Sequence, residues 1–366
     1  MSMEAAKEII TKLDRFIGDR PLGNPCFTDP GVISFPFRKE SFFPLRPMKS
    51  DRKVAFIDGG NLELIGAPNF SVQLNRVYSC LWKDNERCSN ILRIPEIEFF
   101  SAIYSTVKNG EICFESFIVP SSPSYSDYLP DSSQLFMKHS ENSVGDETLM
   151  TGIAKLASVT RSAAEWRFAE KVAELLDKDD VIVLDGSLQV FQRDWKYFLE
   201  LEKTTRERGV ILTSLSKTSG LFTDSGSSVL GAISEFADSN NIEGEWYHPI
   251  FESRKHHVFC MVVKLQSFSD WVFRLDFQLD QFKDLNEEKL NSVLSLFCSN
   301  STDPTFPGYP YGLIDADLSA RVSRDEIDYY RALISSQISE LKRQGRFVRC
   351  IRAGDAHNLL NTIAGF

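Results

Sequence analysis

The 366-residue chain lacks the features of a membrane or secreted protein. No uncharged apolar run approaches the ~20 residues needed to cross a bilayer. The start, MSMEAAKEIITKLDRF, has neither the compact apolar stretch nor the small-residue cleavage site of a signal peptide. The seven cysteines are dispersed and include no C-x-x-C pair, so no zinc or redox motif is indicated. We therefore expect a cytoplasmic protein with reduced thiols and no membrane association.

Acidic residues outnumber basic ones, 51 to 41. A net charge of −10 argues against a protein that coats nucleic acid by bulk electrostatics, because phosphate binding needs concentrated Lys and Arg. It does not exclude a nuclease, since metal-dependent enzymes gather carboxylates and a local basic groove or a partner can contact phosphate. No G-x-x-x-x-G-K-[ST] or G-x-G-x-x-G motif follows a strand, which argues against P-loop and Rossmann proteins.

Hydrophobic periodicity predicts an α/β protein with a ribonuclease-H-like core, in which a mixed β-sheet is flanked by helices and extended by added N- and C-terminal helices. Asn109-Gly110 between two β-type runs predicts a hairpin. We expect residues 1–50 to form an N-terminal helix and loop, and 51–366 to form the main domain with a surface insertion near 120–149. The predicted elements are a helix at 5–17, a strand at 54–58, several strands between 70 and 120, a helix at 150–177, a strand within 179–187, a helix at 189–208, a strand at 209–217, a strand pair at 245–280, and helices at 286–298, 317–343 and 355–364.

Two carboxylates follow short apolar runs in the same way. VAFID ends at Asp58 and VIVLD ends at Asp185, and a glycine comes directly after each. A carboxylate just beyond a buried strand is partly desolvated, and the glycine allows a ligand to approach the backbone. The alternative is that Asp-Gly only makes a turn after each strand.

A third carboxylate lies on the apolar stripe of the long predicted helix. Glu165 is in line with Ala169, Val172 and Leu176, which are spaced to face the core. A buried carboxylate usually has a cation or a hydrogen-bond donor beside it. The partner could be a metal ion, or it could be Arg161, one turn earlier on the helix.

Convergence of Asp58, Glu165 and Asp185 would require a divalent cation. At separations of ~4 to 5 Å the repulsion is roughly 3 to 4 kcal/mol per pair at an effective dielectric constant of 20. Ligands that are all oxygen favour Mn²⁺ or Mg²⁺ over zinc. Two such ions would support hydrolysis of a phosphodiester.

Four motifs, taken together, resemble the NurA nucleases: VAFIDGGN, RSAAEWRFAEKVAEL leading into VIVLDGSLQ, VILTSLSKTSGL and GYPYGLIDADLSARV. The resemblance implies a metal-dependent DNA nuclease with 5′–3′ exonuclease or single-strand endonuclease action on single- and double-stranded DNA. It also implies work beside the hexameric translocase HerA in DNA end processing, repair or defence against phage. The implied metal ligands are Asp58, Glu165 and Asp185, and Tyr309 and Asp317 complete the catalytic set.

Asp317 departs from the commoner family pattern, in which His stands at this position. Asp can bind a metal or orient water, but it cannot act as a cationic contact to phosphate. The alternative for Asp317 is to cap the N-terminus of the helix that follows it. Asp315 is a nearby competitor for the catalytic role.

Four basic residues are candidate DNA contacts. Lys217 matches a recurrent family lysine, with an exposed surface lysine as the alternative. Arg274 shares a strand face with Asp276, so it could lie in a DNA groove or form a structural ion pair. Arg254 and Lys255, in the run SRKHH, supply local positive charge.

The resemblance further implies a homodimer that docks on a HerA-like ATPase, with residues 1–50 among the natural contact regions. Two rival hypotheses remain. One is a non-catalytic scaffold of a HerA-type motor. The other is an actin-like or sugar-kinase-like ATPase, which shares the core and an Asp-Gly-Gly strand end but would need a second phosphate loop of the same kind.

Overall fold

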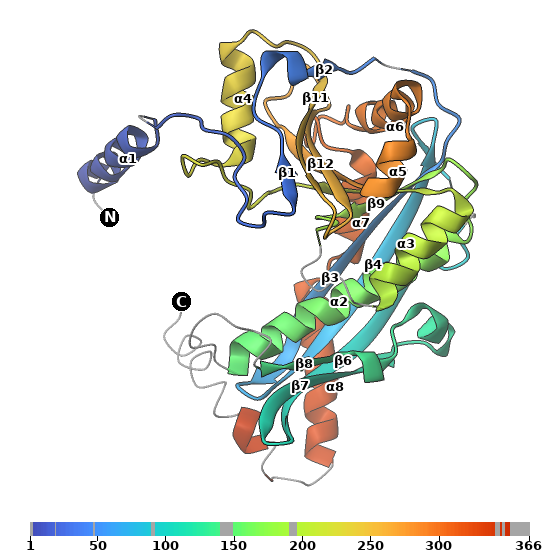
Figure 1. Cartoon of the computed structure of the whole chain (residues 1–366). Coiled ribbons are helices and arrows are strands. Elements are labelled where there is room, and N and C mark those ends of the chain that lie inside the picture. The colour runs from blue at the N-terminus through green and yellow to red at the C-terminus, as the bar shows by residue number, and fades with distance from the viewer. Residues whose placement is uncertain are drawn as a thin grey trace.

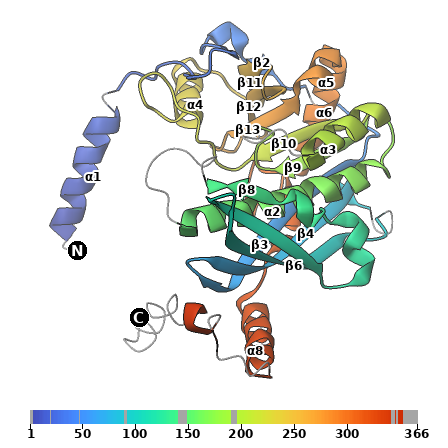
Figure 2. The ribbon, with the colours of Figure 1, turned by 60° about the horizontal axis from the view of Figure 1, so that its bottom comes forward.

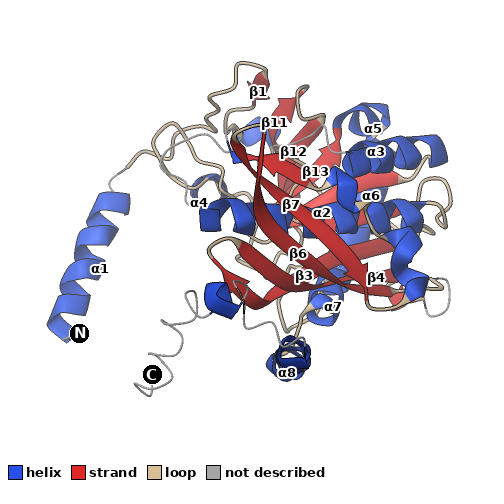
Figure 3. Ribbon diagram, turned by 90° about the horizontal axis from the view of Figure 1, so that it is seen from below, coloured by secondary structure: helices blue, strands red, loops and turns tan. Residues whose placement is uncertain are grey.

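The computed structural model describes residues 3–18, 20–46, 48–88, 92–139, 149–189, 196–340, 345 and 348–351. The described strands form one mixed 13-stranded sheet, and helices cover it on both sides (Figures 1 and 3). The strands are β1 (Val32–Ser34), β2 (Phe43–Pro44), β3 (Val54–Ala67), β4 (Phe70–Lys83), β5 (Glu86–Arg87), β6 (Glu96–Lys108), β7 (Glu111–Pro120), β8 (Phe136–Lys138), β9 (Val181–Asp185), β10 (Ile211–Ser216), β11 (Trp246–Ser253), β12 (Val258–Lys264) and β13 (Phe273–Gln278). The helices are α1 (Met3–Gly18), α2 (Leu149–Ala173), α3 (Lys196–Arg208), α4 (Val229–Ser239), α5 (Leu279–Asp284), α6 (Glu287–Asn300), α7 (Tyr311–Ala320) and α8 (Arg324–Glu340), with short 3₁₀ helices at Lys39–Ser41, Pro123–Tyr128 and Ser132–Gln134.

The centre of the sheet has the predicted ribonuclease-H-like order. Strands β3, β4 and β6 form an antiparallel meander, α2 follows it, and β9 and β10 then add in parallel on the other side of β3. The fold class is therefore confirmed. The predicted hairpin is confirmed too: Asn109 and Gly110 have φ of 53° and 81° and join β6 to β7, the geometry of a tight I′ turn.

Strand β3 was predicted to end at Asp58, but it does not stop or turn there. It continues through Gly59 and Gly60 to Ala67, paired along its length with β4. The glycines serve close packing instead. A Cβ on Gly59 would lie 2.3 Å from Glu165 Oε1, and a Cβ on Gly60 would lie 2.3 Å from the carbonyl oxygen of Ala320.

The two faces of the sheet are packed by different helices. Alternate core residues Ala55, Ile57, Ile182 and Leu184 pack under α2, α3 and α4. Val54, Phe56, Val181 and Val183 pack under α5, α6 and α7. Side chains alternate between the two faces along a strand. The position of a polar residue at a strand end, counted from these core residues, therefore decides which face of the sheet it lies on.

Several predicted boundaries were wrong. The predicted strand pair at 245–280 is three strands, since the chain turns back between Ser253 and Val258 to form β11 and β12 before β13. The predicted helix 317–343 is two helices, because Arg321 is extended and Ser323 opens α8 with a capping box to Glu326. Residues 120–139 are partly core, since β8 pairs with β7 and Leu135 and Met137 are buried. The predicted helix 355–364 and the start of that at 189–208 fall outside the described residues.

Helix α1 stands away from the sheet (Figures 1 and 2), and none of its residues is buried. Its apolar side chains find no cover in the described part of the chain, and Ile10, Phe16 and Ile17 are more than half exposed. None of the described helices is long and apolar enough to pass through a membrane.

Candidate functional site

Asp58 and Asp185 lie side by side on the face of the sheet that α7 covers. Ile57 is in register with Leu184, so the next residue of each strand is one of these two aspartates. Both continue the alternation of the residues that pack under α7, and Lys217 follows the end of β10 in the same alternation. Three neighbouring strands thus bring two carboxylates and an ammonium to one place.

Helix α7 brings a third carboxylate to the same place. Carboxylate oxygens of Asp58, Asp185 and Asp317 all lie within 4.8 Å of one another. Asp317 lies inside α7 and is not the N-cap of a helix, so that alternative was wrong. The competitor Asp315 instead faces Arg87, with 3.5 Å between its Oδ2 and the arginine Nε.

Lys217 bridges the cluster. Its Nζ lies 3.2 Å from Asp185 Oδ2 and 3.0 Å from Asp317 Oδ1, and 5.6 Å from the centroid of the Tyr309 ring. Although its partial burial opposes the charged form, the neighbouring Asp185 and Asp317 raise the pKa of Lys217. This side chain is therefore a fixed cation in contact with two carboxylates, and is not a free surface lysine.

Tyr309 is fully buried and donates from its hydroxyl to Asp185 Oδ1 over 3.1 Å. Burial and the nearby Asp185 raise the pKa of Tyr309, so its hydroxyl keeps its proton and remains a donor. Asp185 is thus oriented by Tyr309 on one oxygen and by Lys217 on the other.

Asp58 carries the strongest electrostatic signal of the cluster. It is 9% exposed, and burial together with the charges of Asp185 and Glu165 raises its pKa to about 8. Lys217 and Arg321 are the cations paired with the three aspartates, and together they leave the group with a net negative charge. The set of three oxygen-bearing side chains fits a hard divalent cation, which would favour the ionised form of Asp58.

Glu165 approaches from the opposite face of the sheet. It projects from α2 over Gly59, where the missing side chain leaves room for it. Its carboxylate is paired with Arg161, the alternative that the sequence left open, and Arg161 also donates to the Gly59 carbonyl oxygen over 2.7 Å. Burial raises the pKa of Glu165 to about 7, against the effect of Arg161. Glu165 therefore borders the group of three aspartates.

Three of the four basic candidates lie elsewhere. Arg274 is 6% exposed and binds both oxygens of the fully buried Asp276, so the structural ion pair is correct and Arg274 cannot reach a DNA phosphate. Arg254 and Lys255 occupy the β11–β12 turn. The strand register places this turn at the end of the sheet away from Asp185, at least roughly 10 Å along the strands.

Sequence reasoning missed two arginines at the rim of the site. Arg321, which directly follows the last residue of α7, pairs with Asp317 four residues earlier. Arg87 donates to the hydroxyl of Tyr78, which lies directly across from Asp58 on β4. The spacing of Asp317 and Arg321 was a readable signal for the first, but nothing local in the sequence connects Arg87 with Asp58.

The raised pKa values give a prediction about stability in a chelator. The native state keeps the Asp58 proton up to a pKa of about 8, whereas the unfolded chain releases it near 3.8. The contribution of this proton to the free energy of unfolding is therefore fully present below pH 4 and is lost as pH rises toward 8. Asp58→Asn should match the wild type near pH 4 and exceed it at pH 8 by at least about 1.4 kcal/mol, the equivalent of one pKa unit. Urea unfolding in EDTA at both pH values measures this.

The matched control is Asp328→Asn, which changes an exposed aspartate on α8 and should have no such effect. Equal stability of wild type and Asp58→Asn at pH 8 would mean that Asp58 ionises in the native state without cost.

The model of the NurA domain matches residues 52–322, which span β3 to the end of α7. No curated protein sequence matches the chain.

Solved structures that align with the chain include nucleases. The catalytic domain of human endonuclease V is 12% identical over 91% of this chain and 99% of its own, with a TM-score of 0.32. Endonuclease V of Ciona intestinalis in complex with inosine-containing DNA is 11% identical over 78% of this chain and 92% of its own, with a TM-score of 0.35. Argonaute of Aquifex aeolicus is 9% identical over 75% of this chain and 29% of its own, with a TM-score of 0.27.

Proposed function

Because this chain belongs to the NurA nuclease family, we propose that it is a metal-dependent deoxyribonuclease whose centre is formed by Asp58, Asp185 and Asp317. The observation that carries the proposal is the convergence of these three carboxylates from β3, β9 and α7 on one face of the sheet. Lys217 and Arg321 offset part of this negative charge, and a divalent cation would offset the rest.

The donor set suits Mn²⁺ or Mg²⁺. Asp58, Asp185 and Asp317 would hold one ion, and Glu165, whose charge acts on Asp58, is the candidate ligand for a second. Such ions, when bound, lower the pKa of an attacking water and stabilise charge on the leaving oxygen.

The protein's own groups prepare the site. Tyr309 and Lys217 fix both oxygens of Asp185, so that this ligand does not need to be ordered when the substrate binds. Lys217 and Arg321 are cations already held beside the carboxylates, and each can turn to a phosphate oxygen when a metal takes its place. Asp317 itself supplies no positive charge, so these two residues provide it.

In this proposal the substrates are single- and double-stranded DNA, cleaved by 5′–3′ exonuclease or single-strand endonuclease action in the cytoplasm. The partners are a second copy of the chain and a HerA-like hexameric ATPase, in DNA end processing, repair or defence against phage. The exposed apolar side chains of α1 offer one surface for such an interaction.

Removal of the metal tests the proposal. End-labelled single- and double-stranded DNA should be degraded with Mn²⁺ or Mg²⁺, left intact in EDTA, and degraded again when excess Mn²⁺ is restored. Labels at the 5′ end and at the 3′ end separate the polarities. Equal degradation with and without EDTA, or none under any condition with or without the ATPase partner, would overturn the proposal.

A further inference from the structure

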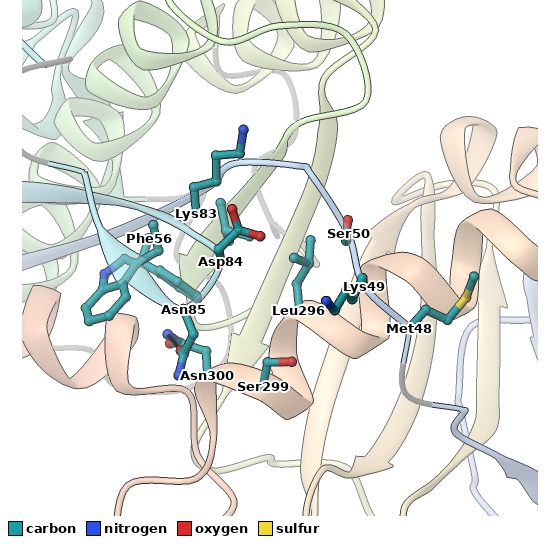
Figure 4. Close-up of a pocket in the computed structure, with 12 residues that line it drawn as sticks. Met48, Lys49, Ser50, Phe56, Lys83, Asp84, Asn85, Leu296, Ser299 and Asn300 are labelled. Atoms are coloured by element: carbon teal, nitrogen blue, oxygen red, sulfur yellow. Dashed lines mark hydrogen bonds between the residues drawn. The ribbon is translucent and has the colours of Figure 1, made fainter.

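A second polar and aromatic site lies at the other end of α7 from Asp317. It is a cavity of about 610 Å³, within the range of small-ligand pockets. Three segments meet there: the chain before β3, the β4–β5 turn and the end of α6. Figure 4 shows side chains from all three around the hollow, including Lys49, Lys83 and Asn300.

The lining combines a flat aromatic surface with positive charge. Val54, Phe56 and Leu296 form an apolar part, and Trp82 adds an indole. Two lysines, Lys49 and Lys83, belong to the lining residues, and the ammonium group of neither is paired with a carboxylate within the described residues. The lining holds one carboxylate, that of Asp84, on an exposed turn residue.

Two amide side chains of the lining are held in place by hydrogen bonds within the protein. Asn300 donates to Asn85 Oδ1 over 2.9 Å and accepts from the Gly312 amide over 2.7 Å. Asn300 therefore joins the cavity directly to the first turn of α7. An aromatic plane with unpaired ammonium groups beside it suits a nucleobase with its phosphate.

The cavity and the carboxylates share one face of the sheet. Val54, Phe56 and Asp58 alternate along β3, and the same face continues on β4 from Trp82 to Tyr78. Tyr311, at the start of α7, packs edge-on against Trp82 with 5.8 Å between ring centroids. Asp58 lies four residues beyond Val54 along β3, or roughly 13 Å away.

A cation lies between the two places. Arg87 on β5 is paired across the strand with Trp82, and its guanidinium reaches the Tyr78 hydroxyl. Its side chain is 51% exposed. Roughly 13 Å corresponds to about four stacked nucleotides at 3.4 Å each, so a short single strand could span from Trp82 past Arg87 to the aspartates.

We propose that this cavity is a nucleotide subsite that stacks one base of a single strand on Trp82 and binds its phosphates through Lys49 and Lys83. The inference rests on the proposed nuclease function and adds to it a place that holds the strand away from the cleavage point. Because Trp82 does not touch the aspartates, a base stacked on it contributes to the affinity for single strands and not to the cleavage step.

The test uses the full chain and a fluorescein-labelled 12-nucleotide oligothymidylate. Binding is measured by anisotropy in EDTA, and cleavage is measured separately with Mn²⁺. Trp82→Ala should weaken binding and raise KM by roughly 10- to 100-fold, the cost of losing one stacked base, with kcat at saturation little changed. Trp82→Phe keeps an aromatic surface and should recover most of the affinity.

Two further variants distinguish the effects of base stacking and of charge from a nonspecific effect of substitution on binding. Tyr329→Ala removes an aromatic side chain that is 61% exposed on α8 and should leave binding unchanged. The double variant Lys49→Gln, Lys83→Gln should lower the slope of log affinity against log salt by about 0.7 for each phosphate that is no longer neutralised.

The outcomes distinguish the two proposals. Affinity of Trp82→Ala within twofold of the wild type overturns the subsite, whether or not the wild type cleaves DNA. Weakened binding by Trp82→Ala but not by Trp82→Phe, in a protein that never cleaves DNA, supports the subsite and overturns the nuclease. Failure of the wild type to bind the oligonucleotide overturns the subsite outright.

Discussion

Asp58→Ala is expected to lower the rate of Mn²⁺-dependent DNA cleavage by roughly 10³-fold or more, the order of loss when a group that stabilises transition-state charge is removed. The physical reason is the position of Asp58 within 4.8 Å of Asp185 and Asp317, where it completes the only group of three or more potential metal ligands found among the described residues. Initial rates on end-labelled DNA at saturating Mn²⁺ measure the effect.

The control for this variant is Asp328→Ala, which removes an exposed carboxylate on α8 and should cleave at the wild-type rate. The thermal midpoint of Asp58→Ala in EDTA should not fall far, because the lost carboxylate is itself costly to bury in its charged form. Undiminished cleavage by Asp58→Ala would rule out the proposed centre.

The second large effect concerns the metal itself. Mn²⁺ is expected to raise the thermal midpoint of the wild type by several degrees, since a ligand at 100 times its Kd adds about 2.7 kcal/mol to stability. Asp185→Asn should abolish this shift, because it removes the charge of the proposed metal ligand that Tyr309 and Lys217 hold in position. Differential scanning fluorimetry over a Mn²⁺ series measures the shift.

The same titration ranks the two candidates for the third ligand. Asp317→Asn should lose most of the shift, whereas Glu165→Gln should keep the larger part, because Glu165 is already neutralised by Arg161 on the other side of the sheet. The reverse ranking would favour Asp58, Glu165 and Asp185 as the primary ligands. No shift in any protein, with DNA present or absent, would contradict a metal centre.

Much of the fold followed from local pattern. Several elements could be predicted because each depends on residues close in sequence. They are the Asn109-Gly110 hairpin, the long helix α2, and the strands β9 and β10. The break between α7 and α8 was also encoded locally, in the capping box from Ser323 to Glu326, but the apolar periodicity on both sides concealed it.

The candidate site divides in the same way. The sequence alone determined that Asp58 and Asp185 end buried apolar runs and that Glu165 interrupts an apolar helix stripe, because burial and helical period are properties of short segments. The resemblance of whole motifs added Tyr309, Lys217 and Asp317. Only the tertiary structure decided how these residues sort between the two faces of the sheet.

That sorting depends on strand register and alternation, which no single segment contains. Register places Asp58 and Asp185 on the α7 side with Lys217 and Asp317, and it leaves Glu165 to reach over Gly59 from the α2 side. It also places Arg254 and Lys255 at the far end of the strands and buries Arg274 against Asp276. The sequence thus determined which carboxylates are unusual, and the packing of α7 against β3 decided which of them meet.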